Sequence, residues 1–176
     1  MRQFYYLKQE ADSKVWANVE EGHEFDFWHE DIYKLPLEYP YKFKMINGEF
    51  IDYTPTDTYP IFSTKLRDIV NEFVPKDSIE WIHLTVEDKD GTKHDAYMPR
   101  FIPIPDMFDV LNEELTVLTE HGDLMVPRLS SEKTKDKHFI RLIGNPLINY
   151  VSEDLKKAMQ KAKVKGVKFK KAKMYP

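Results

Sequence analysis

The side chains with the greatest capacity for chemistry are concentrated between Glu20 and Asp31, where the chain reads EEGHEFDFWHED. Carboxylates stand here beside aromatic rings and two histidines, and no basic residue interrupts them. A structural or catalytic metal site needs three or four convergent ligands, and the sequence contains no HExxH or HxH spacing. We therefore predict no metal at this segment and expect it to create a local field of negative sign.

The remaining candidates for chemistry have simpler structural explanations. The segment DKDG at 88–91 matches only a fragment of a calcium-binding loop, and a hairpin turn between two strands accounts for it better. Ser63 and Ser152 lack the GxSxG surroundings of a nucleophile, and the absence of cysteine excludes a thiolate nucleophile and a disulfide scaffold. We predict no catalytic residue, no metal and no cofactor, and an enzyme with an unrecognised site stays as an alternative.

The C-terminal segment is rich in lysine, and its charge is opposite to that of the acidic segment. Residues 153–176 carry a net charge of +7, so the first 152 residues carry −11 within the overall formal charge of −4. Lysines can bind phosphate backbones without sequence specificity, which leaves a nucleic-acid-binding or phosphate-binding module as a second alternative. The segment has no arginine, and Phe169 alternates with lysines as a core position would. We therefore consider nucleic acid an improbable partner and favour a solvated strand edge that the lysines protect.

Two amphipathic helices are predicted to position these segments, one over 63–74 and one over 152–163. Apolar residues recur in both at the i, i+3, i+4, i+7 spacing of a helix face. They are Leu66, Ile69, Val70 and Phe73 in the first helix and Leu155, Ala158, Met159 and Ala162 in the second. A serine precedes each helix, where its hydroxyl can accept a hydrogen bond from the first turn. A third helix over 107–118 is left open, because its apolar spacing fits but no stop signal follows before Gly122.

Most of the remaining chain is predicted to be extended. Alternating polarity over 80–87 places Ile82, Leu84 and Val86 on one face, and the segment 94–101 would be the return strand of a hairpin. Further strands are expected at 4–8, 16–19, 124–129 and 139–143. Strands that do not alternate regularly with helices indicate an α+β fold, here mainly antiparallel sheets with two or three short helices.

Composition and length complete this prediction. The chain is 41% hydrophobic, and no Gly/Ser linker or low-complexity tract divides it, so we expect a single domain over residues 1–176. No apolar run approaches the roughly 20 residues of a membrane span. A cytoplasmic protein without a membrane partner is the simplest interpretation.

The order of several short motifs resembles a bacterial family of immunity proteins that accompany polymorphic toxins. The resemblance covers about Asp52 to Phe169. Its C-terminal motifs are Phe139-Ile140-Arg141-Leu142-Ile143-Gly144, Val151-Ser152 and Gly166-Val167-Lys168-Phe169. Its upstream motifs are Ile51-Asp52-Tyr53, Pro60-Ile61-Phe62-Ser63 and Phe73-Val74-Pro75. The family has no defined functional residues that could be assigned to positions of this chain.

The resemblance implies a non-enzymatic protein that binds and neutralises a cognate toxin. Many toxin effectors are cationic nucleases, and an acidic, aromatic-rich surface would supply both steering and anchoring contacts. We therefore predict a partner-binding surface in the acidic segment, formed by Glu24, Asp26, Trp28, Glu30 and Asp31. The alternative is that Phe25, Phe27 and Trp28 belong to the hydrophobic core. The identity of the toxin and the oligomeric state do not follow from the sequence.

Overall fold

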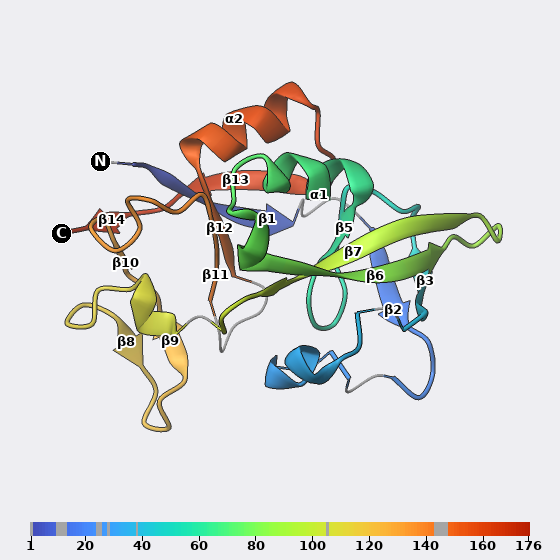
Figure 1. The fold of residues 1–176 in the computed structure, drawn as a ribbon, viewed down its shortest axis with the longest axis horizontal. Coiled ribbons are helices and arrows are strands. Elements are labelled where there is room, and N and C mark those ends of the chain that lie inside the picture. Colours follow the sequence, from blue (N-terminus) through green and yellow to red (C-terminus); the bar gives the residue numbers. More distant parts are fainter. Residues whose placement is uncertain are drawn as a thin grey trace.

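The computed structural model describes residues 2–9, 14–23, 26–27, 29–37, 39–104, 106–142 and 148–176. Its larger sheet has six strands (Figure 1). Their order is β2 (Trp16–Val19), β3 (Tyr41–Asn47), β6 (Ile79–Glu87), β7 (Lys93–Phe101), β5 (Ile61–Ser63) and β4 (Tyr53–Thr54). The second sheet has the order β11 (Phe139–Arg141), β12 (Asn149–Ser152), β1 (Phe4–Gln9) and β13 (Val167–Lys171).

Short elements complete the fold. Two further strand pairs join β8 (Val117–Leu118) to β9 (Leu124–Val126) and β10 (Leu129–Ser130) to β14 (Met174–Tyr175). The α-helices of the described residues are α1 (Thr64–Asn71) and α2 (Glu153–Lys161). Short 3-10 helices are η1 (His29–Lys34), η2 (Lys76–Ser78) and η3 (Met107–Asp109). An α+β architecture is therefore confirmed.

The same arrangement of strands and a helix occurs once in each of the two large sheets. Helix α1 connects β5 to β6, and β7 lies between these two strands, antiparallel to both. Helix α2 connects β12 to β13, and β1 lies between them in the same way. In each unit one further antiparallel strand lies on the outer side of the first strand. This strand is β4 beside β5 in the first unit and β11 beside β12 in the second. The similarity of the segments around Ser63 and Ser152 in the sequence therefore reflects two split β-α-β units.

Both helices begin where the sequence predicted. The hydroxyls of Ser63 and Ser152 accept hydrogen bonds of 3.2 Å from the backbone N–H of Leu66 and Leu155 respectively. The helices lie side by side (Figure 1) and share one core with both sheets. Its fully buried members include Leu7, Phe62, Leu66, Val70, Val151, Leu155 and Met159.

Each helix ends two or three residues earlier than the ranges 63–74 and 152–163 predict. After α1 the hydrogen-bond spacing shortens to three residues, since the N–H of Phe73 donates to the carbonyl of Val70. Pro75 then ends the helix. After α2, Lys163 adopts a left-handed φ of 53°, and Val164 donates back to the carbonyl of Met159.

A helix over 107–118 is not observed, which corrects the possibility left open from the spacing. The only helical element there is η3, because Val110 and Leu111 then pair with the strand at Leu129. A turn at 113–115 and β8 follow. The N–H of Ser130 donates to the carbonyl of Val110 over 2.9 Å. Consecutive buried residues on an extended chain can produce the same apolar spacing as a helix stripe, and here a non-local strand partner decides the conformation.

The six-stranded sheet curls until its two edges meet. The N–H of Ala17 in β2 donates to the carbonyl of Pro55, directly after β4, over 3.1 Å. The inward positions of β6, Ile82, Leu84 and Val86, are buried inside the curl, as their alternation predicts. Most strand pairs are antiparallel, but β3 pairs in parallel with β6, so the six-stranded sheet is mixed, and the separate pair β10 and β14 is parallel. The curl brings the acidic segment after β2 close to the turn after β4.

Among the described residues, no helix is long and apolar enough to cross a membrane.

Candidate partner-binding site

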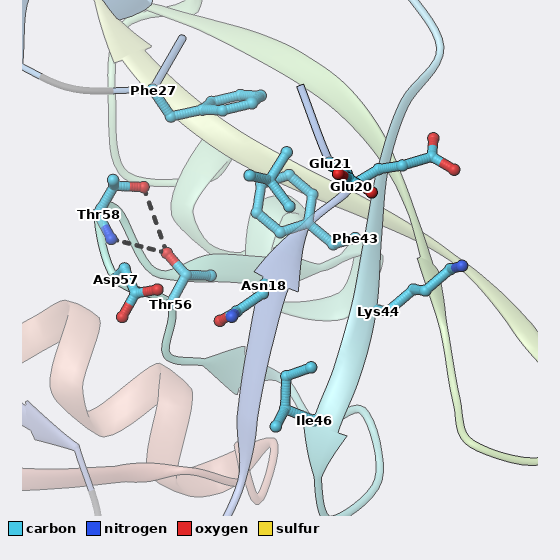
Figure 2. A pocket seen from close by; sticks show the side chains of 11 residues that line it. Asn18, Glu20, Glu21, Phe27, Phe43, Lys44, Ile46, Thr56, Asp57 and Thr58 are labelled. Carbon is cyan, nitrogen blue, oxygen red and sulfur yellow. Dashed lines mark hydrogen bonds between the residues drawn. The ribbon is translucent and has the colours of Figure 1, made fainter. Parts of the chain in front are cut away.

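A cavity of about 800 Å³ opens beside the first part of the acidic segment, bordered by β2, β3 and the turn at 56–58 (Figure 2). Its lining combines aromatic and aliphatic side chains with hydroxyl, amide and charged groups. The residues are Asn18, Val19, Glu20, Glu21, Phe27, Phe43, Lys44, Ile46, Thr56, Asp57 and Thr58. Cavities of this size are typical of ligand sites, which lie between about 300 and 1,000 Å³.

Two phenylalanines form the aromatic part of the lining. Phe43 is an inward residue of β3, where burial alternates along the strand, and it is 2% exposed. Phe27 is 1% exposed and packs edge-on against Phe43, with 5.3 Å between ring centroids and 65° between ring planes. Because both rings are anchored in the hydrophobic core, this part of the lining is rigid.

The turn after β4 lines one side of the cavity with the hydroxyl groups of Thr56 and Thr58. The hydroxyl of Thr56 donates to the carbonyl of Tyr59 over 2.9 Å and accepts from the N–H of Thr58 over 3.1 Å. Since the single proton of Thr56 is used, the contact of 3.3 Å between the two hydroxyls requires Thr58 to be the donor. The Thr58 oxygen therefore retains acceptor capacity beside the cavity, where Figure 2 draws the two hydroxyls side by side.

Charged side chains of both signs stand around the opening, with acids in excess. Glu20, Glu21 and Asp57 line the cavity, and Lys44 is the single basic residue in its lining among the described residues. Glu20 is held only loosely by Lys42, with 3.9 Å between Oε2 and Nζ at an exposed position. The lining residues therefore give the opening a formal charge of −2.

The structure describes only part of the predicted patch. Glu24 and Trp28 lie outside the described residues, as do the side chains of Glu30 and Asp31, whose backbone belongs to η1. The Asp26 side chain is 40% exposed, and its Oδ2 lies 2.6 Å from Nδ1 of His23. The prediction that the five residues form one surface is therefore not tested.

The buried guanidinium of Arg100 holds the segment 32–35 in place. Arg100 in β7 donates to the carbonyls of Ile32 and Leu35 at 3.2 and 2.8 Å, at the end of η1. Its Nε donates to Oε2 of Glu80 over 2.8 Å. The chain after the acidic segment is thereby tied to the curled sheet.

Phe27, one of the residues weighed as core, is indeed buried. Its position directly after Asp26 connects the acidic segment to the cavity. No motif in the sequence marks the other lining residues Asn18, Thr56, Asp57 and Thr58 as parts of a site. The polar run at 54–58 predicts a turn, but nothing local indicates that this turn meets β2.

The lysine-rich segment lies on the edge of the other sheet. In β13, which borders only β1 among the described strands, Lys168, Lys170 and Lys171 are exposed, and Phe169 packs against the core shared by the two helices. This is the arrangement expected of a strand edge protected by lysines.

Within the part of the chain that the structure describes, no three His, Asp or Glu side chains converge as metal ligands. Several histidines there contact neighbouring polar groups instead. His94 Nε2 lies 2.7 Å from Asp88 Oδ2, and His138 Nδ1 lies 2.8 Å from Ser152 Oγ. Burial lowers the pKa of His138 below its ordinary value of 6.5, and the Arg2 guanidinium acts in the same direction against a smaller opposing effect of Asp154.

Comparison with known proteins identifies the family. No protein with curated annotation matches the sequence. The model of the Imm11 immunity protein family matches residues 13–174 of the 176, a span that includes the cavity, the first split β-α-β unit, β12, α2 and β13 of the second unit, and the lysine-rich edge, but not β1. The chain therefore belongs to the Imm11 family of immunity proteins.

Proposed function

We propose that this protein binds a cognate bacterial toxin domain and neutralises it without catalysing a reaction. The observation that carries the proposal is the match to the Imm11 family over residues 13–174. Inhibition by binding requires a surface that covers the toxin's active site, and such surfaces rely on a few anchoring side chains within a larger contact area. We further propose that the protein acts in the cytoplasm of the toxin-producing cell, as a single domain over 1–176.

The acidic segment is the part of the surface that we assign to the toxin. Its predicted contact residues remain Glu24, Asp26, Trp28, Glu30 and Asp31. Asp26 supports the assignment, since its carboxylate is 40% exposed although it contacts His23. A negative surface accelerates association with a cationic partner, whereas a positive one would repel it. The net charge of −11 over the first 152 residues, with the +7 confined to the C-terminal segment, is consistent with a cationic partner for the acidic segment.

Co-expression tests the proposal. We expect the toxin to be the variable C-terminal domain of a large secreted protein encoded in a neighbouring reading frame, and its expression alone should stop growth. Co-expression of the intact chain should restore growth, whereas an unrelated immunity protein should not. A charge-reversed chain with Asp26→Lys and Glu30→Lys should protect less well at an equal level of soluble protein. Toxicity that persists despite abundant soluble wild-type chain would refute the proposal.

A further inference from the structure

We infer that the cavity beside β2 is a socket for one arginine side chain of the toxin. This inference rests on the proposed function and adds to it the chemistry of the group that enters. It concerns residues beside the predicted acidic patch, chiefly Glu20, Glu21, Asp57 and Thr58, which no comparison assigns to any role.

The hydrogen-bonding capacity of the lining favours a donor. The carboxylates of Glu20, Glu21 and Asp57 are acceptors only at neutral pH. Thr58 has already committed its proton to Thr56, so its oxygen is available as an acceptor. A guest that fits this lining therefore brings several N–H groups and no acceptor, and arginine is the side chain with five donors and no acceptor.

The amide of Asn18 adds to this bias. Its Oδ1 accepts a hydrogen bond of 2.8 Å from Nε1 of Trp16, which fixes the amide at the edge of β2. The two donor groups in the lining are then the Asn18 amide nitrogen and the ammonium of Lys44, against three carboxylates and a hydroxyl oxygen. The excess of acceptors is what separates this cavity from one built for a phosphate or a carboxylate.

The number and spread of the acceptors favour arginine over lysine. A guanidinium is planar, weakly hydrated and presents five donors in a rigid fork, whereas an ammonium is a compact and strongly hydrated point charge. The rings of Phe27 and Phe43 are 1% and 2% exposed, so they close the base of the cavity and leave contact with the guest to the polar and aliphatic side chains. Aliphatic surface from Val19 and from Ile46, which is 45% exposed, can pack against the methylene groups of an arginine.

The negative charge of the lining also favours a cationic guest. The opening carries a formal charge of −2, and Glu20 has only a weak, exposed partner in Lys42. A guanidinium bound beside these carboxylates is partly removed from water, and close charge pairs across interfaces have large coupling energies.

A double-mutant cycle tests the inference. The chain variant Glu20→Gln/Glu21→Gln/Asp57→Asn removes three carboxylates and preserves side-chain size. Its control, Glu114→Gln/Glu120→Gln/Glu132→Gln, removes three exposed carboxylates elsewhere in the fold. Affinity for the purified toxin domain is measured by calorimetry. We expect the cavity variant to bind at least about tenfold more weakly than the control variant.

The toxin side of the cycle identifies the guest. Each surface arginine and lysine of the toxin domain is replaced in turn by glutamine. One arginine replacement should weaken binding to the wild-type chain and have little further effect on the cavity variant, which is the signature of direct coupling. A coupled lysine, or equal binding by the cavity and control variants, would overturn the inference and leave the proposed function intact. If the folded wild-type chain does not bind the toxin domain, both fail.

Discussion

Gly166 offers the sharpest test of how the two split β-α-β units are joined. It lies directly before β13 with φ at +89°, in the region that favours glycine. A Cβ atom at this position would lie 2.4 Å from the carbonyl oxygen of Tyr53 and 2.8 Å from Cδ1 of Ile51. The Tyr53 backbone cannot move away freely, because its N–H donates to the carbonyl of Lys165 over 3.2 Å. The mutation Gly166→Ala must therefore displace backbone that belongs to the larger sheet.

The expected cost has two parts. The left-handed backbone costs about 1–2 kcal/mol for a residue with a Cβ atom. The clash with Tyr53 adds the loss of at least one buried backbone hydrogen bond and of local packing, about 2 kcal/mol or more. We expect Gly166→Ala to lower the free energy of unfolding by about 3–4 kcal/mol. With a urea slope of about 2 kcal/mol per M, the midpoint falls by about 1.5–2 M.

Gly91 is the matched control. It has almost the same φ, +87°, but no heavy atom lies within 4 Å of the position that a Cβ would take. Gly91→Ala should therefore cost only the backbone part, about 1–2 kcal/mol. Urea denaturation followed by tryptophan fluorescence measures both variants. Equal losses of stability would refute the close approach of Gly166 to Tyr53.

Three further predictions concern the hydrogen bonds that support this junction. Ser152→Ala removes the buried hydroxyl that caps α2 and should lower the free energy of unfolding by about 1–2 kcal/mol in urea denaturation. Because burial lowers the pKa of His138, the unfolded state binds its proton more readily. Stability should therefore fall as the pH drops below about 6.5, and His138→Asn should flatten this dependence of the urea midpoint. Asp52 accepts hydrogen bonds from Ser63 Oγ and from the N–H of Lys165, both at 2.8 Å. Asp52→Ala should therefore lower the free energy of unfolding, measured by urea denaturation, by about 2–4 kcal/mol, and Asp52→Asn should lower it distinctly less. Equal effects of the two Asp52 variants, an unchanged pH profile for His138→Asn, or a neutral Ser152→Ala would each contradict the corresponding assignment.

Elements with a strong local signal could be predicted from the sequence. The alternation of Ile82, Leu84 and Val86 marks a strand with one buried face, and the structure confirms it. Ser63 and Ser152 cap their helices through side-chain contacts that span only three residues. In these cases the residues that determine the structure are neighbours in the chain.

Elements that depend on distant partners could not be predicted. The segment 107–118 has helical spacing, but the pairing of Leu111 with Leu129 extends it. The cavity depends on the contact between Ala17 and Pro55, which closes the curled sheet and brings two turns together. The acidic segment signalled a binding surface by its charge, yet charge alone does not indicate which neighbouring turn completes the site.

Titration of the toxin with the purified protein tests the central proposal most directly. The activity of the purified toxin domain is measured at rising molar ratios of the intact chain, and the mass of the toxin is determined afterwards. A protein that neutralises by binding should abolish the activity at about a one-to-one ratio and leave the toxin mass unchanged. Full activity at a molar excess of the chain would contradict neutralisation, and complete inactivation at a small fraction of the toxin concentration would contradict a non-enzymatic mechanism.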